Sequence, residues 1–194
     1  MYTAKDFTHL LGLTGFSDTM LTNHFTLYGG YVTNSNKFLE KLDTVEKGSI
    51  EYNEIKRRLG WEINGIKLHE AYFGNMTKDN SGDLSSELDK NINIKNALIK
   101  SYGSLTEWEA SIKRNGMMRG IGWVLLIQDS ETKEIFHTWV GEHNVGHISG
   151  VKVLLVMDCW EHAYITDYGI KRADYINAFI NTIDWDVVES RYNA

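Results

Sequence analysis

Cysteine and proline are almost missing from this sequence of 194 residues, which has one cysteine, Cys159, and no proline. A single cysteine cannot form an internal disulfide or a metal site built from several thiolates. The longest purely apolar runs, Trp123–Ile127 and Val153–Met157, fall far short of the about 20 residues that cross a bilayer. These absences exclude a disulfide scaffold and a transmembrane helix. Any metal site must rely mainly on histidine and carboxylate ligands.

The sequence also lacks a long block of charge of one sign. Its net charge is −6, from 20 Lys and Arg against 26 Asp and Glu. This balance argues against nucleic acid or an anionic membrane as the main partner, since both bind basic surfaces. Residues 1–12 have neither the basic start nor the apolar core of a signal peptide, so we expect a cytoplasmic protein.

Helical periodicity dominates the first 76 residues. A long helix is expected over Phe16–Val45, with Ser17 as its N-cap, and the segment Lys47–Ser49 interrupts the pattern. A second helix follows and ends near Phe73. The two helices predict an antiparallel hairpin whose inner faces carry His24 and His69 together with apolar residues.

After Thr77–Asp83, a polar segment with the composition of a linker, the pattern changes. The predicted class is α+β: the N-terminal hairpin (residues 1–78) and a second domain (residues 79–194) with a three-stranded antiparallel sheet. Strands are expected over Gly122–Gln128, Glu134–Val140 and Val151–Met157, and helices near Ser85–Tyr102, Leu105–Met118, Trp160–Tyr168, Asp174–Ile183 and Trp185–Tyr192.

The sharpest local pattern is DCWEH at residues 158–162, where a buried strand ends in Asp158 and His162 follows four residues later. Together with His24 and His69, these residues offer three imidazoles and one carboxylate, ligands that suit first-row transition metals. Three histidines and one aspartate would leave a position for water or substrate, as catalytic metal sites do. The alternative is a capping aspartate and ordinary core histidines.

At these residues the sequence resembles the iron/manganese superoxide dismutase family over nearly its whole length. The segment DCWEHAYITDY at residues 158–168 fits the family pattern D-x-W-E-H-A-x-x-x-x-Y. Supporting matches are YVTNSN after His24, HEAY from His69, GIGW at residues 120–123 and the ending NTIDWDVVESRY. The predicted hairpin followed by a mixed lobe is similar to the family's architecture.

The resemblance implies a role for each matching position. One Mn or Fe ion per subunit would be held by His24, His69, Asp158 and His162. Tyr31 matches the gateway tyrosine, and Trp123 and Trp160 match the aromatic shell around the metal. Glu161 matches the residue that contacts His162 of the partner subunit in a homodimer, and Arg172 matches the basic residue beside the substrate funnel.

The hydrogen-bond donor to the metal-bound solvent is a variable position in the family. Where some members have Gln on the second helix, this sequence has Gly65, so the donor is expected on the sheet side. His143 is the first candidate and His147 the alternative. Tyr28 and Ile165 replace a usual His and Tyr pair across the dimer, and the segment between His24 and Tyr31 is one residue shorter than usual.

The implied function is disproportionation of superoxide to dioxygen and hydrogen peroxide, with no nucleic-acid or membrane partner. Two alternatives remain open: a non-catalytic structural or interaction protein of the same fold, and a metal-site protein with altered redox activity. The sequence does not decide between manganese and iron, or between a dimer and a tetramer.

Overall fold

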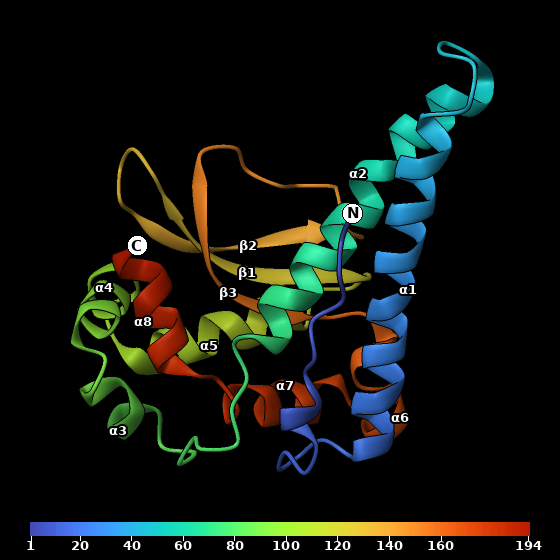
Figure 1. Ribbon diagram of the computed structural model, residues 1–194. Coiled ribbons are helices and arrows are strands. Elements are labelled where there is room, and N and C mark those ends of the chain that lie inside the picture. The colour runs from blue at the N-terminus through green and yellow to red at the C-terminus, as the bar shows by residue number, and fades with distance from the viewer.

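Two long helices form a hairpin that projects beyond the rest of the molecule (Figure 1). The computed structural model describes residues 1–194. A sheet and six shorter helices follow the hairpin. The helices are α1 (Asp18–Leu42), α2 (Ile50–Phe73), α3 (Leu84–Asp89), α4 (Ile92–Tyr102), α5 (Leu105–Gly116), α6 (Ile165–Tyr168), α7 (Arg172–Ile180) and α8 (Trp185–Asn193), and the strands are β1 (Gly122–Asp129), β2 (Ile135–Gly141) and β3 (Val151–Asp158).

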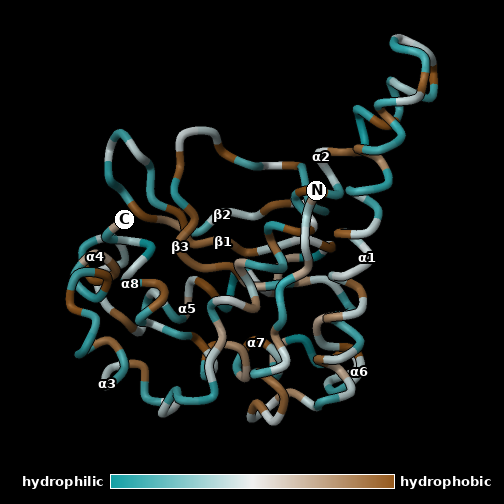
Figure 2. The backbone as a smooth tube through the Cα atoms, in the orientation of Figure 1, coloured by the Kyte–Doolittle hydropathy of each residue, from teal (hydrophilic) through white to brown (hydrophobic).

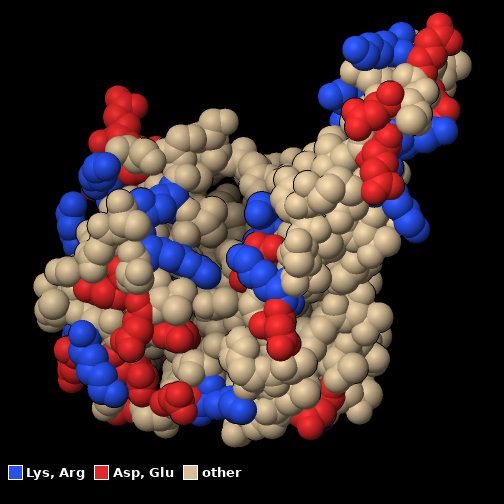
Figure 3. Space-filling model, viewed as in Figure 1, with Lys and Arg blue, Asp and Glu red and all other residues tan.

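Both helices of the hairpin begin at serine caps. The Ser17 hydroxyl accepts a hydrogen bond from the Met20 backbone N–H at 3.0 Å, and the Ser49 hydroxyl accepts one from Tyr52 at 3.1 Å. Each bond satisfies an N–H group that has no partner within the helix. Charged residues of both signs cover the projecting end of the hairpin, whereas the lower part of α1 shows mainly uncharged atoms in this view (Figure 3). No helix combines the length and apolar character needed to cross a membrane.

The three strands form one antiparallel sheet in the order β2-β1-β3, which confirms the predicted α+β class. The central strand β1 is buried along nearly its whole length, and apolar residues run through β1 and β3 (Figure 2). The register places Trp123 of β1 opposite Val140 of β2 and Asp158 of β3. The residues that follow β2 and β3 therefore leave the sheet at the same end, beside the start of β1.

Asn75 joins the hairpin to the sheet just after α2 ends. Its side chain accepts a hydrogen bond from the Val156 N–H at 2.9 Å and donates one to the Val156 carbonyl at 3.2 Å. Arg191 from α8 donates to the same Asn75 oxygen and to the Leu154 carbonyl, at 3.2 and 2.9 Å. Because Asn75 is fully buried, these bonds fix the end of α2 against the middle of β3.

Two predicted helices are wrong in extent. The segment expected as one helix over Ser85–Tyr102 is two helices, interrupted at Asn91, whose side chain bonds the Asp186 carboxylate at 2.9 Å. The segment expected as a helix over Trp160–Tyr168 is a 3₁₀ turn, η2 (Glu161–Ala163), followed by the single turn α6. In both places contacts with distant residues or extended backbone override local helix propensity. The division at residue 78 stays a prediction.

Candidate metal centre

Four residues from four elements meet between the hairpin and the sheet. His24 comes from α1, His69 from α2, Asp158 ends β3 and His162 lies on η2. The first three are buried, and His162 is about a quarter exposed, with a side-chain exposure of 24%. The four candidate ligand atoms all lie within 4.8 Å of one another. The structure thus brings together all four residues that the sequence pattern singled out.

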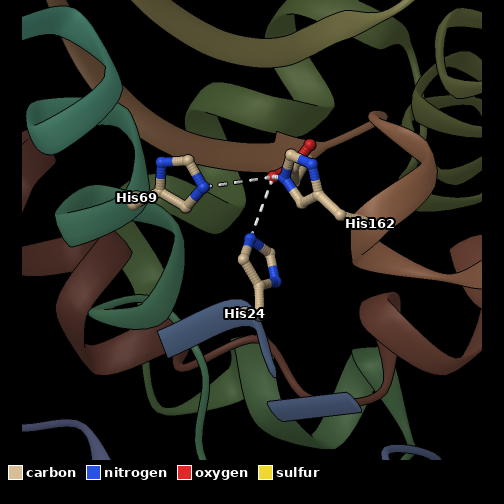
Figure 4. Close-up of side chains that lie close together, drawn as sticks. His24, His69 and His162 are labelled. Carbon is tan, nitrogen blue, oxygen red and sulfur yellow. Dashed lines mark hydrogen bonds and ion pairs between the residues drawn. The ribbon is translucent and has the colours of Figure 1, made fainter. Parts of the chain in front are cut away.

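The three imidazoles converge on one oxygen of the aspartate. Asp158 Oδ2 is 3.1 Å from His162 Nε2, 3.2 Å from His24 Nε2 and 3.8 Å from His69 Nε2. Figure 4 shows His24 and His69 each pointing one ring nitrogen at this oxygen. The other oxygen, Oδ1, accepts a hydrogen bond from the Trp160 N–H at 2.8 Å, which fixes the orientation of the carboxylate.

The protonation states of the side chains in this cluster follow from their burial and their contacts. Burial alone raises the pKa of Asp158, but the nearby His162 and His24 outweigh it, so the pKa lies well below the usual value and the carboxylate is ionised. Burial lowers the pKa of His24 and, more strongly, that of His69, so both rings are neutral at pH 7. His69 Nδ1 lies 2.7 Å from the Gly65 carbonyl and donates to it, which leaves Nε2 with a free lone pair facing the cluster.

A cation fits this arrangement. His24 Nε2 and His69 Nε2 are buried, and neither nitrogen has a hydrogen-bond partner within the chain. The lone pair of His69 Nε2 faces an ionised carboxylate and repels it, and buried polar atoms without partners are unfavourable, unless a positive ion lies among them. Three imidazole nitrogens and one carboxylate oxygen are suitable ligands for a first-row transition metal, and the Gly65 bond fixes the ring of His69 as metal-ligating histidines require.

Aromatic rings enclose the cluster. The centroid of Trp123 lies 4.9 Å from that of His69, and Trp160 stacks on His162 with centroids 5.7 Å apart. Phe73 packs edge-on against His24 at 4.8 Å. These apolar walls limit the entry of water, and a low local dielectric strengthens every charge interaction within the site.

Tyr31 and His143 form a hydrogen-bonded line beside the cluster. The Trp123 indole N–H donates to His143 Nδ1 at 3.0 Å, so the ring proton of neutral His143 is on Nε2. That Nε2 lies 2.9 Å from the Tyr31 hydroxyl and donates to it, which leaves the phenol proton free for another acceptor. Burial lowers the pKa of His143 to about 4 and raises the pKa of Tyr31 above its ordinary value, so neither group is charged at pH 7.

Gly65 makes room for Tyr31. A Cβ atom at residue 65 would lie 2.7 Å from Cδ1 of the Tyr31 ring, a distance too short for any side chain. Tyr31 reaches the site, with its ring centroid 5.1 Å from that of His69. His147, the alternative to His143, uses its Nε2 to bond the backbone carbonyl of His143 at 2.9 Å.

Arg172 and Glu161 differ in how they are held. The Arg172 guanidinium donates to the carbonyls of Met118 and Gly120 at 2.8 Å each, and also to that of Cys159. It therefore ties the start of α7 to the loop before β1 and to the segment after Asp158. Glu161 is exposed, and its side chain makes no hydrogen bond or ion pair within the chain.

Tyr28 and Ile165, two positions expected from the sequence to lie at the dimer contact, have separate surroundings. The Tyr28 hydroxyl accepts a hydrogen bond from the Lys5 N–H at 3.0 Å and donates to Glu70 at 3.1 Å. Glu70 also pairs with the Lys5 ammonium at 2.9 Å. Ile165 is 52% exposed. Tyr28 thus finds its partners within its own chain.

Sequence reasoning missed one aromatic residue of the site. The Trp61 ring lies 4.4 Å from that of His143 and 5.6 Å from that of Tyr31, measured between centroids. A usable signal was present, because residues 61, 65 and 69 are spaced by four and share one face of α2.

Comparison with known proteins agrees with this geometry. Residues 90–191 match the family model described as iron/manganese superoxide dismutases, C-terminal domain. An iron superoxide dismutase of Aquifex pyrophilus is 33% identical over 97% of this chain and 89% of its own length. That of Saccharolobus solfataricus is 34% identical over 84% and 78%, and that of Cupriavidus metallidurans 31% over 94% and 91%. The chain therefore belongs to the iron/manganese superoxide dismutase family of oxidoreductases.

Proposed function

We propose that this protein disproportionates superoxide at one iron or manganese ion held by His24, His69, Asp158 and His162. The observation that carries the proposal is the convergence of three imidazole nitrogens on Asp158 Oδ2, two of them buried without a donor. Two superoxide anions and two protons give one dioxygen and one hydrogen peroxide. When bound, the metal supplies the one-electron exchange, taking an electron from one superoxide and giving it to the other.

Tyr31 and His143 are the proposed proton-handling pair. Because His143 uses its only ring proton on the Tyr31 hydroxyl, the phenol directs its own proton away from His143. Both groups are neutral at pH 7, so a proton given by Tyr31 is replaced from water, while the His143 Nε2–H hydrogen bond stabilises the phenolate oxygen in the meantime. Trp123 fixes the tautomer that makes this direction possible.

The carboxylate of Asp158 sets the charge of the centre. Its negative charge would lower the net charge of an occupied centre by one unit, which would favour the oxidised form of a metal held there. The donor set suits iron and manganese alike. The relatives named above are described as iron enzymes, and we leave the metal of this chain to direct measurement.

We further propose a homodimer in which Glu161 contacts His162 of the partner subunit. Glu161 is exposed and without a partner in its own chain, and the His162 ring next to it remains partly accessible. A bond of this kind would hold the ring of a metal-ligating histidine from outside the subunit. A cytoplasmic location stays a prediction from the sequence.

Metal analysis combined with activity tests the proposed function. The protein is produced with iron or with manganese, the bound metal is counted by elemental analysis, and superoxide turnover is measured per bound atom. We expect about one metal per chain and turnover that depends on it. Bound metal without turnover would favour altered redox activity, and a chain that binds no metal would favour a structural or interaction role.

A further inference from the structure

Trp61 contacts both members of the proton-handling pair from the side away from the metal cluster. Its ring stands at 61° to the ring of His143 and at 58° to that of Tyr31, with the centroid distances given above. Trp61 lies two turns before His69 on α2, so it is carried by the same rigid helix as a candidate ligand. Any change in the position of Trp61 therefore changes the packing of His143 and Tyr31.

The indole N–H of Trp61 reaches across to the loop that carries His143. It donates a hydrogen bond to Glu142 Oε2 at 2.9 Å, and the two residues are 81 positions apart in the sequence. Glu142 has a φ of 49°, in the left-handed region that side chains other than glycine seldom adopt. Its backbone N–H bonds the Ile121 carbonyl at 3.1 Å, so the loop turns sharply at the residue before His143.

Arg58 holds the outer face of the indole. Its guanidinium carbon lies 3.6 Å from the centroid of the Trp61 ring, and its Nε donates to the buried Glu62 carboxylate at 3.1 Å. The indole is therefore enclosed by a cation on one face, by His143 and Tyr31 on the site side, and by Glu142 at its N–H. It has little freedom to rotate.

We infer that Trp61 and Glu142 form a clamp that positions His143, and through it Tyr31, for proton transfer. The Trp61–Glu142 clamp, made of these two side chains, is a positioning device and touches no substrate. The inference rests on the proposed function of the site. His143 lies in the tight turn that follows β2 and is closed by the bridge between Gly141 and Val145, and the chain turns at Glu142. A fixed Glu142 aims the imidazole so that it reaches Trp123 on one side and Tyr31 on the other.

The clamp predicts which variants disturb turnover. Trp61→Phe keeps an aromatic ring but removes the N–H, and Glu142→Ala removes the acceptor. We expect each to lower kcat about tenfold, which is less than the about 100-fold that a 1 Å misplacement of a reacting group can cause, with metal content unchanged. Glu142→Gln keeps an acceptor oxygen, so we expect it to recover most of the turnover lost in Glu142→Ala. Trp139→Phe, at a half-buried β2 residue whose indole N–H bonds nothing, is the matched control.

A second measurement reports on the clamp without using turnover. Ultraviolet resonance Raman spectra of tryptophan report hydrogen bonding of the indole N–H, and the chain has six tryptophans. We expect Glu142→Ala to shift the signal of one indole towards the unbonded position, and Glu142→Gln to leave it bonded. If the Raman signal shifts but neither kcat nor its pH profile changes, the bond is only structural and the inference is wrong.

The outcomes separate the clamp from the proposed function. Protein that binds metal but shows no turnover of superoxide would refute the proposed function, and the Raman comparison would still show whether the Trp61–Glu142 bond exists. An unchanged Raman signal in Glu142→Ala would refute the clamp even in a fully active enzyme. A lower melting temperature with an unchanged kcat and pH profile would also refute it.

Discussion

Histidine nitrogens without hydrogen-bond partners are buried at two places in this protein, in the candidate centre and at His137, and only the first resembles a metal site. In the candidate centre, His24 Nε2 and His69 Nε2 face an ionised carboxylate. On β2, His137 Nε2 is likewise buried and without a partner, but its Nδ1 lies 3.1 Å from the Tyr102 hydroxyl and 3.0 Å from that of Ser111. No carboxylate joins His137.

The comparison shows that a buried imidazole is not by itself evidence for a metal. Burial lowers the pKa of His137 to about 3, so this ring is neutral, as His24 and His69 are. What distinguishes the candidate centre is an anion within 4 Å of three ring nitrogens, two of which are buried without a hydrogen-bond partner. Charge convergence, rather than the presence of histidine, identifies the site.

The largest effect is expected from removing that charge. Asp158→Asn keeps the shape of the side chain but replaces an anionic ligand with a neutral amide. We expect a loss of metal affinity of more than about 100-fold, beyond what the loss of a partner behind a ligand causes. Elemental analysis of the purified variant measures it, with His137→Gln as the control that keeps its metal. Equal metal content in the two variants would remove the distinction between the two groups.

The next largest effect concerns the space beside the metal cluster. Gly65→Ala adds a methyl group 2.7 Å from the Tyr31 ring and must displace that ring. We expect turnover to fall about 10- to 100-fold, the range expected when a reacting group moves by about 1 Å. Gly60→Ala is the matched control, because it lies on the same helix with no atom within 4 Å of the new methyl.

The two glycine variants also differ in stability. Replacing an exposed helical glycine with alanine stabilises a protein by about 0.5–1 kcal/mol, so Gly60→Ala should raise the melting temperature with turnover unchanged. Gly65→Ala gains the same helix propensity, but the clash of the new methyl group with the Tyr31 ring offsets this gain in stability. A fully active Gly65→Ala protein would show that the position of Tyr31 does not control turnover.

A smaller effect is expected on the pH dependence of stability, through the protonation of His137. Its pKa is about 3 in the folded protein and about 6.5 in an unfolded chain. A lowered folded pKa means that the unfolded state binds the proton first, so the stabilisation is complete above pH 6.5 and is lost as the pH falls towards 3. In His137→Gln, the slope of the unfolding free energy against pH over this range should decrease by up to about 1.4 kcal/mol per pH unit.

Denaturant unfolding at several pH values measures this slope. His9→Gln serves as the control, because His9 is exposed. An unchanged slope in His137→Gln would mean that His137 is protonated in the folded protein over this pH range. His137 would then not be a neutral buried imidazole, and it could not be compared with His24 and His69.

The smallest effect concerns access to the candidate metal centre, which an anionic substrate has to reach and which His137 does not share. The net charge of −6 repels an anion, so attraction has to come from local cations. We expect Arg172→Ala to lower kcat/KM by a few-fold at low salt, to flatten its salt dependence and to leave metal content unchanged. Lys37→Ala changes the net charge equally at an exposed position of α1. Equal rates for the two variants would leave Arg172 with its carbonyl-binding role alone.

The candidate ligands could be predicted from the sequence because their signals are local. The DCWEH pattern places Asp158 and His162 by spacing, and helical periodicity places His24 and His69 on the inner faces of their helices. The Trp61–Glu142 bond and the Arg172 bonds to the carbonyls of Met118 and Gly120 could not be predicted in this way, because they join residues 52 to 81 positions apart. The break at Asn91 has the same cause, since its partner Asp186 lies 95 residues away.

The proposed ligands come from opposite ends of the chain, His24 and His69 from its first part and Asp158 and His162 from its last. If these four residues hold the ion, neither part alone supplies the full ligand set, and complete metal loading would wait until the sheet has closed on the hairpin. Once bound, the ion acts as a staple between segments almost 140 residues apart, and separating them requires breaking metal bonds. Escape of the ion and global unfolding should therefore occur together.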